Sequence, residues 1–162
     1  VQTIRRLCRR RRRRDALPHF LHQVRPGIRK KHRAVTPADL WTWGESLPMA
    51  TASFPFDEHT LVLKIAGEKM FCVVPLDRSE DAPQMVLKFP QDQLEELRAQ
   101  HPCLIHASHF NNNHWSGVLL DGSESSQMVQ DWVKQSYNLV LAGMPKRRVA
   151  ELGLAPLPRR AL

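Results

Sequence analysis

The sequence predicts an α+β domain in which an antiparallel sheet packs against helices. Three observations support this fold class. Helical patterns of apolar residues lie near both ends of the folded part, at 36–47 and 123–143, and two apolar β-type runs joined at Gly67 have the form of a hairpin. Further β-type runs lie between them, at 84–89 and 103–106. With 162 residues and no internal repeat, the chain has the length of one domain.

The first helix is predicted to begin at Thr36. Thr36 is a favourable N-cap, Pro37 suits the first helical position, and Asp39 places an acid in the first turn. Apolar residues then recur at helical spacing on one face, at Leu40, Trp43 and Leu47. The dipeptide Leu47-Pro48 ends the helix.

The hairpin follows, with strands at 61–65 and 70–74. A polar, acidic loop at 78–83 separates it from the strand at 84–89. Cys72 falls inside the second hairpin strand among apolar neighbours, so we expect a buried thiol there and not an activated nucleophile.

A short helix is predicted after Pro90 and Asp92, with leucines facing inward and an end at His101-Pro102. The strand at 103–106 leads into the stretch 109–122, which begins as a polar loop and ends as a strand. Three asparagines at 111–113 favour turns, whereas the apolar residues after them favour a strand.

The last helix has the strongest pattern, because its apolar residues follow one face from Met128 to Leu141 before Gly143 and Pro145 end it. Lys146, Arg147 and Arg148 are predicted to form a short extra turn, and 149–162 a loose tail.

The composition favours a soluble, cytoplasmic protein. No apolar run approaches the ~18 residues of a membrane helix, and no apolar stretch follows the basic start as in a secretory signal. Three cysteines at unrelated spacings, with no Cys-x-x-Cys pair, argue against a disulfide framework or a zinc ribbon. We therefore expect reduced, buried thiols.

The net charge of +8 belongs to the first 34 residues, which contain 13 Lys and Arg and one acid. The remainder, 35–162, has 24 − 13 = 11 basic and 16 − 1 = 15 acidic residues, a net charge of −4. The segment 1–34 has two interpretations, a disordered basic arm around the arginine run 9–14 or a mis-set start, since the chain begins with Val and has no Met before Met49. The domain is then predicted to span 35–148.

A set of landmarks in one order then identifies a relative. They are Phe54-Pro55-Phe56, Lys64, Lys69-Met70-Phe71, Leu87-Lys88, His114-Trp115, Leu120-Asp121-Gly122 and Ser136-Tyr137. With these, the chain from Thr36 to Arg148 closely resembles the MmcQ/YjbR family. The resemblance implies a secretion-chaperone-like, double-wing fold with the order α-β-β-β-β-α-β-β-α, and a DNA-binding role. Asn112 stands where the family often has a lysine.

The candidate nucleic-acid contacts are basic or polar residues that could reach a phosphate or a base edge. They are Lys64, Lys69, Lys88, His109, Asn111, Asn112, His114, Lys146, Arg147 and Arg148. Binding requires several of them to converge. Lysines beside a hairpin turn also protect sheet edges, and Lys134 is expected on the solvent face of its helix. His114 and Trp115 have a structural interpretation, in which Trp115 covers the sheet edge or the core.

Catalytic and metal-binding patterns are weak. His106, His109 and His114 lie on a strand and a loop, where alternation divides them between faces, and no nucleotide-binding or nucleophile-elbow glycine pattern occurs. We expect no enzyme activity, no cofactor and no metal. Two functions remain open. One is a DNA-binding protein that grips the phosphate backbone with low specificity. The other is an interaction module, monomeric or weakly dimeric, that holds a protein or peptide partner in a groove or on a sheet face, with no role at a membrane.

Overall fold

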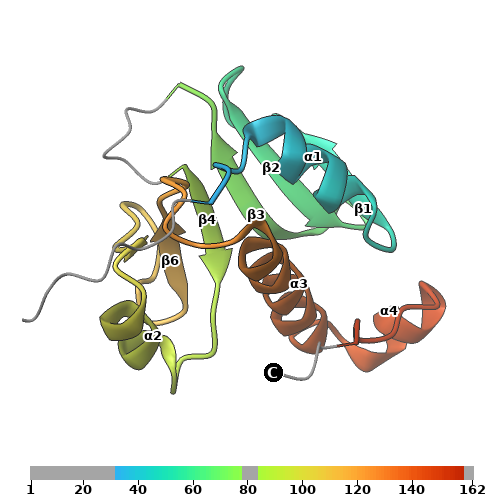
Figure 1. Ribbon diagram of the computed structural model, residues 1–162. Helices are drawn as coiled ribbons and strands as arrows, with labels where there is room; N and C mark the ends of the chain where they lie inside the picture. The colour runs from blue at the N-terminus through green and yellow to red at the C-terminus, as the bar shows by residue number, and fades with distance from the viewer. Residues whose placement is uncertain (1–31, 78–83, 159–162) are drawn as a thin grey trace, which may run out of the picture.

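A six-stranded antiparallel sheet organises the computed structural model, which describes residues 32–77 and 84–158 (Figure 1). The strand order is β1-β2-β3-β4-β6-β5. The predicted α+β class, with an antiparallel sheet packed against helices, is confirmed. Predictions on 1–31, 78–83 and 159–162 lie outside the described residues.

The elements follow the predicted order. They are α1 (Pro37–Glu45), β1 (Ala50–Ser53), β2 (Thr60–Ile65), β3 (Lys69–Pro75), β4 (Met85–Lys88), α2 (Leu94–Gln100), β5 (Leu104–Ile105), β6 (Trp115–Val118), α3 (Ser126–Ala142) and α4 (Lys146–Glu151). Strand β1 has the sequence ATAS, in which alanines are the only apolar residues, so only the family resemblance implied a strand there. The predicted extra turn at 146–148 is the start of α4.

The hairpin of β2 and β3 turns at Gly67, whose φ of 70° suits glycine. A register shift between Leu63 and Lys64 places one extra residue in β3, so that Cys72 pairs with Leu63 while Met70 pairs with Lys64. Phe71 lies between them and points into the core. The irregularity therefore gives β3 two consecutive core residues and then returns Val73 to the opposite face.

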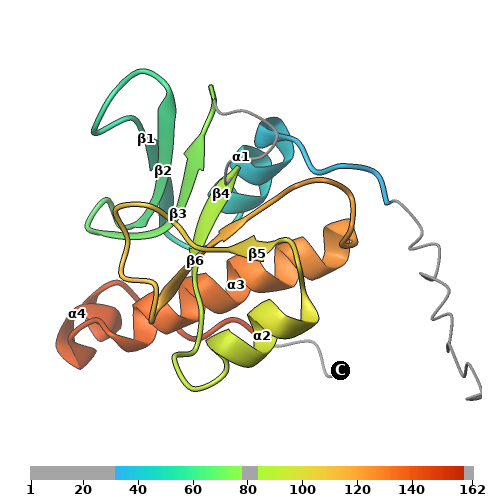
Figure 2. The same cartoon turned by 90° about the vertical axis from the view of Figure 1, so that its left-hand side faces the viewer.

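Helices α1 and α3 cover one face of the sheet, α1 over β1 and β2 and α3 over β3 and β4 (Figure 1). The predicted N-cap of α1 is confirmed, and it forms a capping box, because Thr36 Oγ1 accepts from Asp39 N at 3.2 Å and Asp39 Oδ2 accepts from Thr36 N at 2.9 Å. The hydrogen bonds that Asp39 Oδ2 accepts from Thr36 N and from Thr36 Oγ1 hold the pKa of Asp39 below its usual range. Figure 2 shows α2 beside β5 and α4 at the far end of α3.

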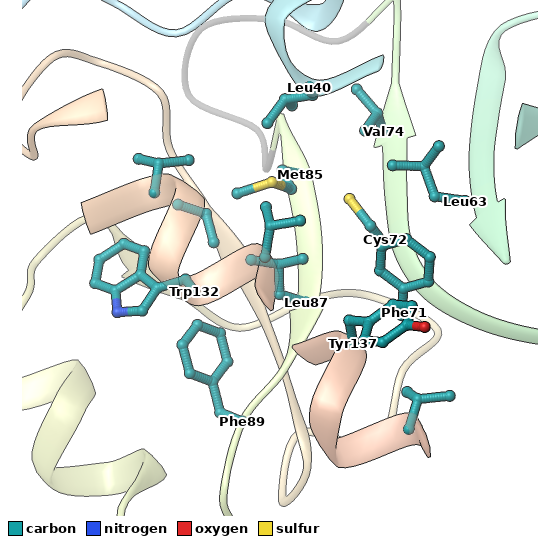
Figure 3. Packing of buried hydrophobic residues seen from close by; sticks show 14 of the residues in the cluster. Leu40, Leu63, Phe71, Cys72, Val74, Met85, Leu87, Phe89, Trp132 and Tyr137 are labelled. Carbon is teal, nitrogen blue, oxygen red and sulfur yellow. The ribbon is translucent and has the colours of Figure 1, made fainter. Parts of the chain in front are cut away.

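The core between these helices and the sheet is rich in aromatic contacts (Figure 3). Phe71 meets Tyr137 edge-on, with ring centroids 5.4 Å apart, and Phe89 meets Trp132 at 5.9 Å. Ser136 is buried among them, and its hydroxyl accepts from Lys88 N at 2.8 Å and donates to Phe71 O. This one hydroxyl fixes α3 against two neighbouring strands.

The opposite face of the sheet is also apolar. Val62, Val73 and Val86 lie side by side across β2, β3 and β4 and are buried there, together with Ala107. We call this the open face, because none of the four helices covers it within the described part of the chain. Burial on both faces explains why the hairpin runs are continuously apolar and do not alternate.

Both ends of the described chain pack more closely than predicted. His32 N donates to Gly122 O at 2.8 Å, and a Cβ at Gly122 would lie 2.6 Å from His32 O, so contacts with the domain begin before the predicted boundary at 35. The predicted loose tail is ordered as far as 158, because Asn138 bonds both N and O of Leu157 and several apolar residues of 149–157 pack on the core. No helix among the described residues is both long and apolar enough to span a bilayer.

Candidate functional site

The open face contains a groove of about 440 Å³ between the sheet and the loop that joins β5 to β6. We call residues 107–114 of that loop the asparagine loop; Figure 2 shows it leaving β5 and passing beside β3 and β4 before it returns as β6. The groove is lined by Phe56, Thr60, Met70, Val73, Pro75, Val86, Ala107, Ser108, His109, Phe110, Asn111 and Trp115. Aliphatic side chains form its floor, and aromatic and polar residues surround its mouth.

Asn112 holds the asparagine loop in shape. Its Oδ1 accepts from Ala107 N at 2.8 Å, and its Nδ2 donates to Ala107 O at 3.2 Å and to Phe110 O at 3.3 Å. Both ends of the amide are therefore used within the loop, and Asn112 is not free to contact a ligand. We predicted it as a nucleic-acid contact, and the structure corrects this to a structural role.

Arg98 of α2 also stabilises the asparagine loop. Its guanidinium donates to the carbonyls of Asn112 and Trp115, each at 3.0 Å, and to Ser116 Oγ at 3.3 Å. The side chain is only 9% exposed and also pairs with Glu95 at 2.7 Å. Nothing in the sequence distinguishes Arg98 from a solvated helix charge, so sequence reasoning missed it.

The aromatic residues of the groove come from two separate parts of the chain. Phe110 and Trp115 contact each other with ring centroids 5.5 Å apart and planes inclined by 48°. Phe56, in the segment between β1 and β2, is 68% exposed at the groove's edge. Trp115 therefore lines the groove and belongs to the smaller cluster of the open face, not to the main core.

The loop also presents polar groups. His109 has a φ of 66°, a left-handed conformation that is uncommon for a residue with a side chain and often occurs at functional sites. Asn111 Oδ1 accepts from Asn113 N at 3.1 Å, whereas its Nδ2 has no partner among the described residues. Both residues line the groove.

The charges of the sheet are of one sign. Within the six strands that the structure describes, Lys64, Lys69 and Lys88 are the charged residues, and no strand contains a carboxylate. Lys64 pairs with Met70 and Lys88 pairs with Trp115, and both partners line the groove, so these two lysines share the open face. They lie on β2 and β4, about two strand spacings or ~10 Å apart.

The remaining basic candidates lie elsewhere. Lys69 pairs with the core residue Ile65 and therefore faces the helical side of the sheet. On α4, Arg148 Nε donates to Glu68 Oε1 at 2.9 Å, and this hydrogen bond holds the pKa of Glu68 below its usual range. Arg147 pairs with Glu151 at 2.9 Å. Lys146 extends from the same short helix. The structure thus does not bring the 146–148 cluster to the asparagine loop, and two of its three charges are neutralised.

Among the described residues, His114, Cys72 and Cys103 occupy structural positions. His114 is half-buried and its carbonyl accepts from Phe89 N at 2.8 Å, which ties the start of β6 to the end of β4. Within the described residues, no three His, Cys, Asp or Glu side chains come together as metal ligands. Cys72 and Cys103 are both buried, as predicted, and burial raises the pKa of the Cys103 thiol to about 11.

Sequence comparison identifies relatives of the central part of the chain. A family model described as YjbR matches residues 45–139, more than half of the chain. The protein named "Uncharacterized protein YjbR" in Escherichia coli, strains K12 and O157:H7, is 33% identical over 69 residues. That match covers 43% of this chain and 58% of the relative, so it spans little more than half of the curated protein.

Structural comparison extends the similarity. The crystal structure of Deinococcus radiodurans protein DR2400, a DUF419 domain, superposes with a TM-score of 0.68 at 30% identity, over 78% of this chain and 94% of that one. A Pseudomonas syringae protein superposes with a TM-score of 0.55 at 17% identity, over 65% of this chain and 99% of that one, which shows the same fold alone.

Proposed function

Because the chain belongs to the YjbR family, we propose that it is a non-enzymatic nucleic-acid-binding protein that contacts the phosphate backbone with the open face of its sheet. Sequence specificity is low in this proposal. Lysines contribute affinity that does not depend on sequence, because they contact phosphates and not base edges. The family resemblance suggested DNA, and the arrangement of charge on the sheet supports a polyanion as the ligand.

The observation that carries the proposal is the separation of charge within a domain of net negative charge. Residues 35–162 have 11 basic and 15 acidic residues, yet the strands contain lysines and no carboxylate. Lys64 and Lys88 flank the groove and have no ion pair among the described residues, so no internal partner needs to be displaced when a phosphate binds. A net negative domain can bind a polyanion only where its cations are grouped in this way.

The test compares two double variants of the full chain that change the net charge equally. Lys64→Gln/Lys88→Gln removes the open-face pair, and Lys134→Gln/Lys146→Gln removes two lysines on helices that have no ion pair in the described part of the chain. The basic segment 1–34 is present in both variants and contributes the same background DNA binding to each. Fluorescence anisotropy is measured with a random-sequence DNA oligonucleotide, single-stranded and duplex, at several salt concentrations.

We expect the open-face variant to reduce affinity for at least one form of DNA and to lower the slope of log K against log salt by about 1.4–1.8, since each neutralised phosphate contributes ~0.7 in single strands and ~0.9 in duplex. The control pair should leave the slope near that of the parent chain. Equal behaviour of the two variants would refute the proposal.

A second function rests on a different observation, the apolar floor of the groove. Met70, Val73 and Val86 are suited to apolar side chains of a peptide, as in a protein interaction module. Selection from a displayed peptide library tests this. Enriched apolar peptides that bind the parent chain, and lose binding when Phe56 becomes alanine, would favour this function over nucleic-acid binding.

A further inference from the structure

The groove has the volume and lining for a flat aromatic ligand. Phe110 and Trp115 form one wall, and Phe56 borders the groove with most of its ring exposed. Val73 and Val86 form the floor, which is itself packed and buried. The volume of about 440 Å³ lies in the lower part of the range for small-ligand pockets, roughly 300–1,000 Å³. One planar ring system fits this space, whereas a helix or a duplex does not enter it.

The polar groups at the mouth match the edge of a nucleobase. The free Nδ2 of Asn111 is a hydrogen-bond donor, the His109 ring offers one donor and one acceptor in its neutral form, and Ser108 adds a hydroxyl. These residues are adjacent in a loop whose conformation Asn112 and Arg98 maintain. The backbone that carries these exposed side chains is therefore held in place before a ligand arrives.

Lys64 and Lys88, which are the proposed phosphate contacts, lie beside the groove on β2 and β4. Along β2 and β4, the open-face valines Val62 and Val86 precede the lysines by two residues, a distance of about 7 Å. The lysine ends can thus reach a backbone that runs across the strands while a base points into the groove. The main chain at Lys88 is anchored, because Lys88 N donates to Ser136 Oγ at 2.8 Å.

We propose that the groove holds one unpaired nucleobase, which makes single-stranded nucleic acid the preferred ligand of the open face. This inference rests on the proposed function and adds the class of ligand to it. A base in a duplex presents only its edges, because both ring faces are stacked, and it cannot insert between aromatic side chains unless it leaves the helix. Stacking is tolerant of base identity, in agreement with low sequence specificity.

Two phenylalanines separated by one proline provide a matched test. Phe56 lines the groove, whereas Phe54 contacts Trp41 with ring centroids 6.0 Å apart and is not part of the groove lining. Both rings are exposed, 68% for Phe56 and 41% for Phe54, so neither Phe56→Ala nor Phe54→Ala is expected to unfold the protein. The probes are labelled oligothymidine, oligouridine and a DNA duplex of equal length, measured by anisotropy with the full chain at raised salt, which suppresses binding by the basic segment 1–34.

We expect the parent chain to bind the single strands more tightly than the duplex. Phe56→Ala should weaken single-strand binding about 5- to 150-fold, the range for loss of one stacked base, with Phe54→Ala near the parent value. Comparison of oligothymidine with oligouridine distinguishes DNA from RNA as the source of the strand. Photo-cross-linking of a bromouracil-containing strand, followed by peptide mapping, should label the asparagine loop or Trp115.

Equal affinity for single strands and duplex, with the two phenylalanine variants alike, would overturn the unpaired-base inference. The proposed function would survive that result if Lys64→Gln/Lys88→Gln still weakened binding relative to its control. Cross-links confined to residues 1–31 would overturn the inference as well, because the bound base would then lie away from the groove.

Discussion

Asn112 and Asn111 are neighbours in the sequence, and the structure assigns them opposite roles. Asn112 makes three hydrogen bonds inside the asparagine loop, at 2.8, 3.2 and 3.3 Å, whereas the Asn111 side chain makes one local bond at 3.1 Å. We therefore predict that Asn112→Ala destabilises the fold and that Asn111→Ala does not. The pair separates a residue that shapes the groove from one that faces its ligand.

The size of the expected loss of stability follows from the groups that Asn112→Ala leaves without a hydrogen-bond partner. Ala107 is 1% exposed, and its N–H bonds to Asn112 Oδ1. A buried donor left unsatisfied costs ~1–3 kcal/mol, and loss of the two weaker bonds from Nδ2 adds to this, although solvent at the loop surface replaces part of them. We expect a loss of about 2 kcal/mol in the free energy of unfolding, or a fall in Tm of roughly 6–8 °C.

Urea unfolding at equilibrium, followed by circular dichroism, measures the effect. Asn112→Asp is an informative third variant, because it keeps the acceptor for Ala107 N and loses both donors, so its loss should be intermediate. Asn111→Ala should stay within about 0.5 kcal/mol of the parent chain, as surface changes do. If Asn112→Ala were as stable as the parent and lost only ligand binding, Asn112 would be a contact residue and the structural role would be wrong.

Two further predictions use a chain that begins at His32, which keeps the His32–Gly122 hydrogen bond and buried Val35. Removal of residues 1–31 should leave Tm unchanged but remove most of the affinity for duplex DNA. The remaining binding should have a slope of log K against log salt of about 2, which comes from the two open-face lysines. A large loss of stability would show that the removed segment packs on the domain. The same chain retains Cys72 and Cys103, and burial raises the pKa of Cys103 to about 11 and that of Cys72 further. At pH 8 both cysteines are thiols, so their alkylation by iodoacetamide in the native protein should be about a hundredfold slower than in urea. The alkylation rate of Cys103 should increase as the pH rises toward 11. Native alkylation rates within about tenfold of the rate in the unfolded protein would contradict the burial.

The order of elements was readable from the sequence because each local signal had one physical cause. Thr36, Pro37 and Asp39 together satisfy the first turn of a helix, and no other local structure uses that combination as well. Gly67 permits the left-handed turn of the hairpin. The apolar face of α3, from Val129 to Leu141, could only be buried against the sheet.

The site was predicted less completely, because its parts meet only after folding. The sequence indicated a polar loop and Lys64 and Lys88 as contacts, and the structure places these near one groove. It also indicated Asn112, whose amide is used inside the loop, and the 146–148 cluster, which lies on another part of the surface. An amide in a loop and a cation on a helix have the same local signal whether they face a ligand or a neighbour.

The sequence by itself therefore determined the fold class, the start of α1, the hairpin and the division between a basic beginning and an acidic domain. Those properties depend on residues close together in the chain, or on charge, which is additive. Only the tertiary structure decided that Lys64 and Lys88 share a face, that Arg98 supports the asparagine loop, and that Arg148 is neutralised by Glu68. Each of these depends on strand register or on a contact between distant segments, and a shift of one residue in register would send a lysine to the opposite face.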